Sequence, residues 1–554
     1  MQVLNWFRLS RKRWWFIGKY LTLFVCCCVL IISCGSRPKT EQAAAPNTSA
    51  GGSGRLVVGT TLKPRTLDPA DAYELAATNV LYSLGDRLYT YKLGTDELQP
   101  QLATKLPEVS KDGLTYKIPV REGVVFHDGT PFDAAAMVFS LKRFMQNGGK
   151  PSSLLADIVQ SVEASGKYEL TIKLKRPFAP FPSLLAFSGM CAVSPKAYEI
   201  GSGKFQPTKF VGTGPYQLVA FTPNSVRLDV FDKYWGEKPP NKGLDFQILT
   251  SSANLFNSFR TGAVDLAYQA FDPDQITSLK NGANSGGWQV IEGPSNNVSY
   301  MVLNIKQKPL DKLEVRQALA YLMNRKLINE RVLRNQAQPA YSLIPTGFDA
   351  SKPTFETAYG DGNIAKAKEL LTKAGFTTSN PLKLEIWYPT GSAVRQQVAS
   401  TLREYAAQQL AGIVQIQPQP VEAPTLFANI GKGLYQTALV DWYPDFSDPD
   451  NFIQPLVSCT KGSDAKGCEE GASQSQGSFY YSDRMNKLIE QERTEQDPQK
   501  RKQIFAEIQD LIAKDLPLIP IWQPKEYAFA KKGLTQVKLD PIQQLPLWDI
   551  GKGA

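Results

Sequence analysis

Residues 441–452, DWYPDFSDPDNF, combine four carboxylates, several large aromatic rings and two prolines, without any Lys, Arg or His. Aromatic rings supply apolar walls with an electron-rich face, and a carboxylate neutralises positive charge. This combination of residue types suits the binding of an organic cation. We therefore take this stretch as the first candidate for a ligand-binding site.

Two simpler interpretations compete for the same stretch. It does not fit a calcium-binding EF-hand loop, because its twelfth residue is Phe452 and not Glu. A solvated acidic turn accounts for Asp448 and Asp450, since Asp-Pro-Asp-Asn is strong turn chemistry. A turn leaves the aromatic residues unexplained, so the cation-binding hypothesis is kept.

Catalytic chemistry is restricted by the single histidine of the chain, His127. A zinc site with two histidines cannot be built, and a Ser–His or Cys–His pair could use only this residue. His127 lies in FHDG, at the predicted end of a strand, and we expect it to have a structural role. Pairs of carboxylates remain, so a secreted hydrolase stays open as an alternative.

The N-terminus carries the clearest targeting signal. The chain has a net charge of +10, and the first 33 residues contain five basic residues and no acid. The apolar run at 20–33 is short for a membrane span, which needs about 20 residues, and it suits a secretory signal. No basic stripe stands out elsewhere, so nucleic acid is not a predicted partner.

The signal runs into IISCGS, which resembles the bacterial lipobox. That resemblance implies that residues 1–33 are removed and that Cys34 becomes a lipid-bearing N-terminus. Residues 34–54 are polar and rich in Gly, Ser and Ala, as is typical of a flexible tether. We expect an exported protein, anchored by lipid to a bacterial membrane on its periplasmic or cell-envelope side.

Cysteine usage agrees with export. Beyond Cys34, only Cys191, Cys459 and Cys468 remain. Cys459 and Cys468 flank a short polar loop that can bring its ends together, and we predict a disulfide between them. Cys191 is expected to be a buried apolar residue.

The predicted elements alternate between strands and helices. Strands are predicted at 56–58, 168–176 and 413–417, and a strand pair resembling a hairpin at 114–129. Helices are predicted to begin near Pro131, to run from Asn363 to Gly375 and over 393–410, and to lead from 501 into a strand near the end. With 554 residues, the chain is expected to form an α/β to α+β fold of several lobes.

Six ordered blocks resemble the bacterial extracellular solute-binding proteins of family 5. The first reads DGLTYKIPVREGVVFHDGTPFDAAAMVFSLKR, and the last is WYPDFSDPDNF, within the stretch described above. The resemblance as a whole extends over about 55–550, essentially the whole exported chain. The blocks occupy 112–143, 211–236, 259–268, 310–328, 365–376 and 442–452.

The resemblance implies a fold of two α/β lobes joined by a hinge, with an extra subdomain in the first lobe. The expected first lobe is 55–96, 208–302 and 518–550, with 97–207 as its inserted subdomain. The expected second lobe is 303–517. The hinge crossings are expected at 300–306 and 516–522.

The resemblance also implies a function, namely the capture of solutes for an ABC importer. In peptide-binding members, an Asp in a W-x-x-D-[YF] segment holds the α-ammonium of the peptide. That spacing assigns this role to Asp445, with Trp442, Tyr443 and Phe446 around the ligand. Arg395 lies in the region where some members clamp the peptide carboxylate.

The expected partners are therefore short peptides with a free N-terminus, a membrane permease and its ATPase, and the protein is expected to be a non-enzymatic monomer without cofactor or metal. An opine-like compound, an oligosaccharide or a chelated metal remains an alternative ligand on the same fold.

Overall fold

The computed structural model describes residues 54–269, 271–540 and 545–553. The predicted signal peptide, Cys34 and nearly all of the predicted tether lie outside the described residues. Within the described part of the chain, no helix has the length and apolar character needed to cross a membrane.

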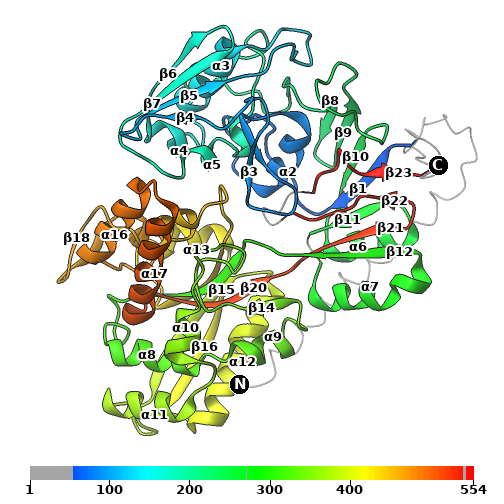
Figure 1. Cartoon of the computed structure of the whole chain (residues 1–554). Coiled ribbons are helices and arrows are strands. Elements are labelled where there is room, and N and C mark those ends of the chain that lie inside the picture. Colours follow the sequence, from blue (N-terminus) through cyan, green and yellow to red (C-terminus); the bar gives the residue numbers. More distant parts are fainter. Residues whose placement is uncertain (1–53, 270, 541–544, 554) are drawn as a thin grey trace, which may run out of the picture. The chain divides into compact units, whose positions relative to one another are not determined.

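A mixed seven-stranded sheet forms the first core (Figure 1). At its centre β1 pairs in parallel with β10 and β11, and the outer strands are antiparallel. In spatial order the strands are β12 (Trp288–Gly293), β21 (Glu526–Lys531), β11 (Leu266–Tyr268), β1 (Leu56–Thr60), β10 (Leu244–Ile248), β9 (Ser225–Val230) and β8 (Tyr216–Thr222).

Both faces of this sheet are covered by apolar side chains, because successive residues of a strand point to opposite faces. Val58 packs with residues of α2 (Leu75–Leu84). Its neighbour Val57 packs on the other face with residues of α6 (Ser252–Thr261) and α7 (Pro273–Gly286).

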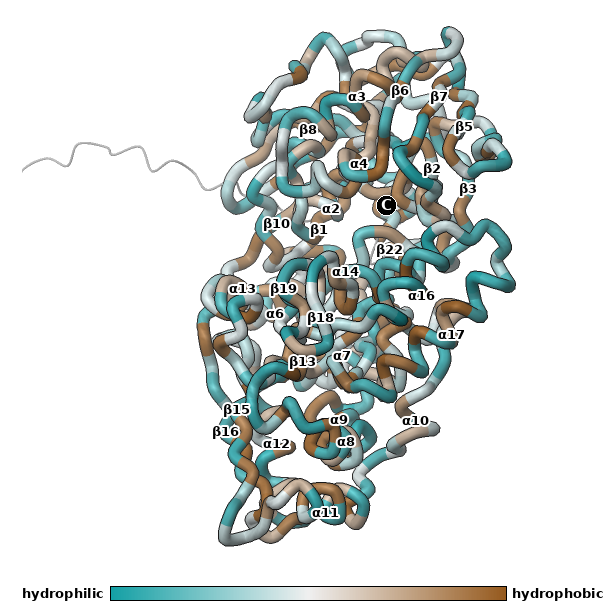
Figure 2. The backbone as a smooth tube through the Cα atoms, turned by 90° about the vertical axis from the view of Figure 1, so that its left-hand side faces the viewer, coloured by the Kyte–Doolittle hydropathy of each residue, from teal (hydrophilic) through white to brown (hydrophobic). Residues whose placement is uncertain are grey.

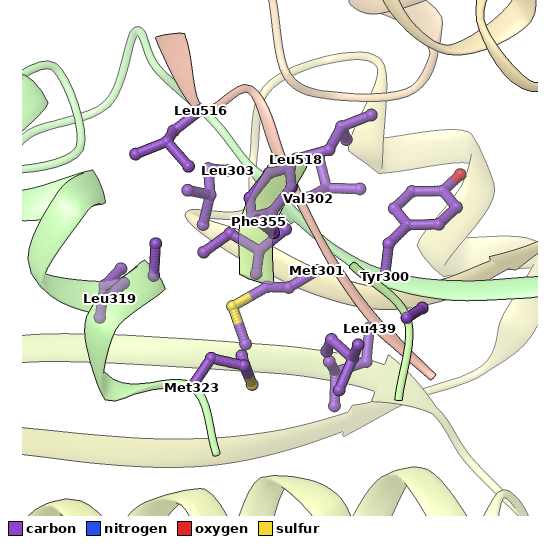
Figure 3. Close-up of a cluster of buried hydrophobic side chains, with 14 of the residues drawn as sticks. Tyr300, Met301, Val302, Leu303, Leu319, Met323, Phe355, Leu439, Leu516 and Leu518 are labelled. Atoms are coloured by element: carbon purple, nitrogen blue, oxygen red, sulfur yellow. The ribbon is translucent and has the colours of Figure 1, made fainter. Parts of the chain in front are cut away.

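The second core surrounds a six-stranded sheet. Its strands, in spatial order, are β14 (Ala337–Pro339), β20 (Leu518–Pro524), β13 (Val298–Leu303), β17 (Thr437–Trp442), β15 (Leu382–Pro389) and β16 (Val414–Val421). Figure 3 shows part of this core, where Met301 of β13 lies beside Met323, with Leu319 on one side of them and Leu439 of β17 on the other. The helices of this region are α8 (Leu313–Leu322), α9 (Arg325–Arg331), α10 (Thr354–Tyr359), α11 (Ile364–Lys373), α12 (Ala393–Leu410), α13 (Ala423–Ile430), α14 (Gln454–Val457), α15 (Ala472–Ser475), α16 (Asp483–Thr494) and α17 (Pro498–Asp515).

A smaller antiparallel sheet lies within the segment expected to be an inserted subdomain. Its strands are β4 (Glu108–Val109), β5 (Thr115–Pro119), β7 (Glu169–Leu174) and β6 (Val159–Gly166). It shares a core with α3 (Ala134–Gln146), α4 (Ser153–Ala156), α5 (Phe181–Leu184) and the hairpin of β2 (Tyr89–Tyr91) and β3 (Leu98–Pro100). Asp133 begins α3 by accepting a hydrogen bond from the Ala136 amide, as an N-cap does.

Several expectations are confirmed by these elements. Asn363 caps α11, Gly375 adopts a left-handed conformation just beyond it, and α12 spans the predicted range. In Figure 2, hydrophilic and hydrophobic residues alternate along α16 and α17, as amphipathic helices require. The hairpin expected within 114–129 is wrong, because β5 pairs with β4 and β7 while the later residues form only two isolated bridges, Val120 to Ala103 and Val125 to Pro131.

The two crossings between the large sheets lie away from the expected segments 300–306 and 516–522. Strand β12 ends in the first sheet at Gly293 and β13 begins in the second at Val298, so the first crossing is 294–297. Strand β20 ends in the second sheet and β21 begins in the first with only Lys525 between them. The expected crossings failed because both apolar runs are fully buried strands: all six residues of β13 are buried.

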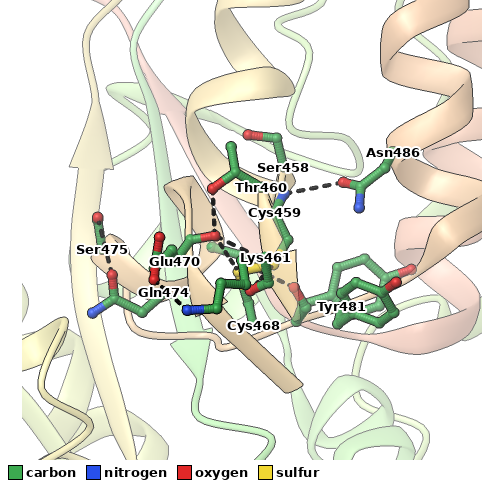
Figure 4. The surroundings of a disulfide bond; sticks show 12 residues. Ser458, Cys459, Thr460, Lys461, Cys468, Glu470, Gln474, Ser475, Tyr481 and Asn486 are labelled. Carbon is green, nitrogen blue, oxygen red and sulfur yellow. Dashed lines mark hydrogen bonds and ion pairs between the residues drawn. A yellow bond between two sulfur atoms is a disulfide. The ribbon is translucent and has the colours of Figure 1, made fainter. Parts of the chain in front are cut away.

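The predicted partners Cys459 and Cys468 form a disulfide that closes the hairpin of β18 (Lys461–Ser463) and β19 (Gly467–Glu470) (Figure 4). The Cys459 amide also donates to Asn486 Oδ1 of α16 at 3.0 Å, which attaches the hairpin to that helix. Cys191 is a buried free cysteine, and burial raises the pKa of its thiol to about 12.

Replacing Cys459 and Cys468 together by Ser is expected to lower the free energy of unfolding by about 2–3 kcal/mol, because the open loop gains conformational entropy when unfolded. Chemical denaturation measures this change. Reduced wild-type protein serves as the control and should show the same loss. An unchanged unfolding midpoint in both samples would contradict the expectation.

Candidate ligand-binding site

Residues 441–447 form one wall of a cavity of about 300 Å³. The opposite wall comes from the region of the first sheet and its insertion. Its residues are Tyr73, Glu74, Leu75, Thr78, Tyr82, Tyr91, Ala186 and Phe187. The cavity therefore lies between segments that belong to different sheets, which is where a ligand can contact both.

The sheet positions this wall. Strand β17 is central in the second sheet, and its last residues Asp441 and Trp442 pair with Ser299 and Val298 of β13. Beyond Trp442 the chain leaves the sheet and enters the 3₁₀ turn Pro449–Phe452, which Asp448 begins by accepting from the Asp450 amide. Residues 443–447 are thus held at both ends, and they lie just beyond the C-terminal end of β17.

Three of the four carboxylates in the stretch are neutralised by arginines. Asp441 forms an ion pair with Arg395 and accepts a 2.6 Å hydrogen bond from Ser299. Asp448 accepts two hydrogen bonds, of 2.7 and 2.8 Å, from Arg501 of α17. Arg493 Nε of α16 lies 3.4 Å from Asp450 Oδ1.

The turn predicted at Asp448 and Asp450 is present, but the expectation that these acids are solvated is wrong. The two residues are 8% and 2% exposed, and each faces a guanidinium. Glu492, which is fully buried, also accepts from Arg501 at 2.8 Å. Burial and the neighbouring Asp450 raise the pKa of Glu492 well above its usual value.

Asp445 is the exception among the four. Among residues 54–269, 271–540 and 545–553, no Lys or Arg forms an ion pair with it. Its side chain has hydrogen-bond partners in Tyr73, from across the cavity, and Asn451, whose Oδ1 also accepts from the Asp445 amide at 2.8 Å. Burial disfavours the charged form and raises the pKa of Asp445 to about 6. A cationic ligand group would supply the missing charge.

The aromatic residues of the stretch have different surroundings. Tyr443 is 48% exposed and lines the cavity. Trp442 also lines it, while packing partly against the core of the second sheet. Phe446 is buried in the core of the inserted region, beside the Ser447 amide, which donates to the Tyr91 hydroxyl at 3.1 Å.

Arg395 lies beside a second cavity, of about 440 Å³. Asp441 and Tyr443 line both cavities, so the two adjoin at these residues. Because Asp441 already pairs with it, the Arg395 guanidinium is not a free positive group for a ligand carboxylate. Its Nη1 donates to Ser392 at 2.8 Å, and its Nε has no partner within the described residues.

The remaining candidates lie outside both cavities. The His127 ring accepts from the Gly212 amide at Nδ1 and is 3.1 Å from the Gly214 carbonyl at Nε2, so its Nε2 carries the proton. Burial lowers the pKa of His127 to about 4, which keeps it neutral in this structural role. No group of three or more His, Cys, Asp or Glu able to hold a metal ion occurs in the described part of the chain.

Sequence reasoning missed the cavity wall opposite Asp445, especially Tyr73 and Phe187. It also missed Glu526, which lines the second cavity just after the Lys525 crossing. No local pattern identifies these residues, because only folding brings them to the acid-aromatic stretch.

A family model of the bacterial extracellular solute-binding proteins, family 5, matches residues 97–464. The chain belongs to this family. It is 28% identical over 492 residues to the glutathione-binding protein GsiB of Escherichia coli K12, covering 85% of this chain and 89% of that protein. It is 27% identical over 485 residues to the dipeptide-binding protein of the same strain, with 83% and 87% covered.

Solved structures agree on the fold of this family 5 protein. The periplasmic binding protein DppA from Helicobacter pylori, in complex with the peptide STSA, superposes with a TM-score of 0.73 at 23% identity, covering 90% of this chain and 98% of that one. The fold is the two-lobe fold of periplasmic binding proteins, as expected. The family places the chain as a substrate-binding protein of an ABC importer.

Replacing Arg501 by Met is expected to lower the free energy of unfolding by about 3–5 kcal/mol, because Asp448 loses its buried partner. Chemical denaturation monitored by tryptophan fluorescence measures the loss. The matched control is Arg484→Met, which removes an exposed ion pair between Arg484 of α16 and Glu507 of α17. That variant should lose about 1 kcal/mol or less. Equal losses in the two variants would contradict this account of the network.

Proposed function

We propose that this protein is a lipid-anchored receptor that captures short peptides with a free N-terminus between its two lobes and delivers them to a membrane permease. One observation carries the peptide assignment: Asp445 is the one carboxylate of the 441–452 stretch that pairs with no arginine among the residues described, and it faces a cavity. A peptide α-ammonium supplies the missing charge.

In this proposal the peptide N-terminus lies between Asp445 and the ring of Tyr73, with Trp442 and Tyr443 along its first residues. The lobes follow the sheets, with the first lobe and its insertion contributing Tyr73 and the second contributing Asp445. A ligand that contacts both lobes stabilises the closed arrangement relative to the open one. The anchor at Cys34 is part of the same proposal.

The hydrolase alternative finds no support at this site. A pair of catalytic carboxylates needs one acid and one base facing the substrate. Asp441, Asp448 and Asp450 are each paired with an arginine, which leaves Asp445 alone within the stretch.

Replacing Asp445 by Asn is expected to raise the dissociation constant of a tripeptide such as Ala-Ala-Ala by about 100-fold or more, because the buried ammonium loses its counter-charge at a cost of about 3–5 kcal/mol. Isothermal titration calorimetry measures the change. Asp232→Asn, at a side chain that is 93% exposed, serves as the control. The Asp445→Asn variant should fold at least as stably as wild type, since it removes a desolvated charge. Unchanged affinity for free-amine peptides would refute the assignment.

Peptide binding should also depend on pH. Below about 6, the raised pKa of Asp445, the carboxyl is protonated in the free protein and the ammonium must displace that proton. The affinity is therefore expected to fall by up to about tenfold per pH unit below this value, and to fall again above about 8 as the peptide amine loses its proton. Calorimetry from pH 4.5 to 9 tests this. The acidic limb should disappear in Asp445→Asn, and its persistence would assign it to another group.

A further inference from the structure

The second cavity continues the first along the line between the sheets. Its walls include Phe271 and Tyr527 from the first sheet's region, Trp522 from the second sheet, and Arg395 at the start of α12. Tyr443 and Asp441 separate it from the cavity of Asp445. A peptide whose N-terminus lies at Asp445 therefore reaches this cavity with its next residues by passing the exposed ring of Tyr443.

The cationic groups that line this cavity already have partners. Arg395 is paired with Asp441, and both side chains are mostly buried. The Lys525 ammonium lies 2.6 Å from Glu292, which also lies 3.1 Å from Lys280. The cavity therefore offers no unpaired cation, among the residues described, to receive the carboxylate of a short peptide.

Its acidic groups are not all paired. Asp272 caps helix α7 by accepting from the backbone of its first turn, so this carboxylate already has a role. Glu526 forms no ion pair with any cation in the described ranges. Its side chain lies beside Ser295, with the phenol groups of Tyr443 and Tyr268 nearby. Burial raises its pKa to about 7, as expected for a carboxylate without a counter-charge.

The two cavities thus repeat one arrangement: an aromatic wall beside a carboxylate that has neither a cation nor a capping role among the described residues, Asp445 in the first and Glu526 in the second. We infer that the second cavity receives a cationic side chain through Glu526, so that the substrates are short peptides carrying Lys or Arg within the first few residues. This inference rests on the proposed function. It replaces the expectation that Arg395 clamps a peptide carboxylate, and it leaves the peptide's C-terminus unclamped.

The test compares three tripeptides, Ala-Lys-Ala, Ala-Ala-Ala and Ala-Glu-Ala, by calorimetry at pH 7.5, with Lys-Ala-Ala to cover the neighbouring position. Wild type should bind Ala-Lys-Ala or Lys-Ala-Ala at least ten times more tightly than Ala-Ala-Ala. It should bind Ala-Glu-Ala most weakly of the four. Glu526→Gln should abolish the preference while leaving the affinity for Ala-Ala-Ala within about twofold. Retained affinity for the neutral peptide also shows that the variant is folded.

The matched control is Asp272→Asn, which removes the other carboxylate of the cavity that is not paired with an arginine and keeps a good helix cap. It should keep the preference for basic peptides. Equal affinity of wild type for basic and neutral peptides would overturn the inference, as would a preference that survives Glu526→Gln or disappears in Asp272→Asn. If no peptide binds at all, it is the proposed function that fails, so the two failures are distinguishable.

Discussion

A buried carboxylate is stabilised in its charged form by a nearby positive charge. This requirement determines how residues 441–452, which include the cavity wall 441–447, are held in place. Arg395, Arg493 and Arg501 reach residues 441–452 from three different helices and fix three acids in place. Breaking a buried pair leaves a charge in a medium that solvates it poorly, so each pair holds its segment firmly. The fourth acid, Asp445, is held in position by its neighbours and has no cationic partner in the described part of the chain.

The acids of this stretch therefore have two different roles, which explains why so many occur in twelve residues. The acids at either end of the 443–447 segment attach it to the second sheet and to α16 and α17, whereas Asp445 faces the cavity. A binding group is most effective when its supporting shell prevents it from relaxing toward other partners. The accompanying cost is that burial raises the pKa of the Asp445 carboxyl to about 6.

The sequence allowed the fold class, many helices and strands, and the place of Asp445 to be predicted, because periodicity, caps and family spacing are local properties. The partners of its neighbouring acids were not predictable, since Arg501 becomes a neighbour of Asp448 only after α17 has packed. The surroundings of Glu526 were likewise not predictable, because no local pattern distinguishes this first residue of β21 from other strand residues. The crossings between the sheets were predicted in the wrong places. The apolar segments 300–306 and 516–522 have a composition that suits a connection at an interface as well as a buried strand.

The packing of Phe446 affects the rate at which the lobes separate, and hence the rate of ligand release. It belongs to the 443–447 segment that follows β17 of the second sheet, yet its ring is buried in the core of the inserted region, next to the hydrogen bonds of Ser447 with Tyr91 and Asp96. Separation of the lobes must withdraw this ring into water, which costs about 1.5–3 kcal/mol. If that cost falls on the opening step, the residence time of a captured ligand lengthens by roughly ten- to a hundredfold, whatever the ligand is.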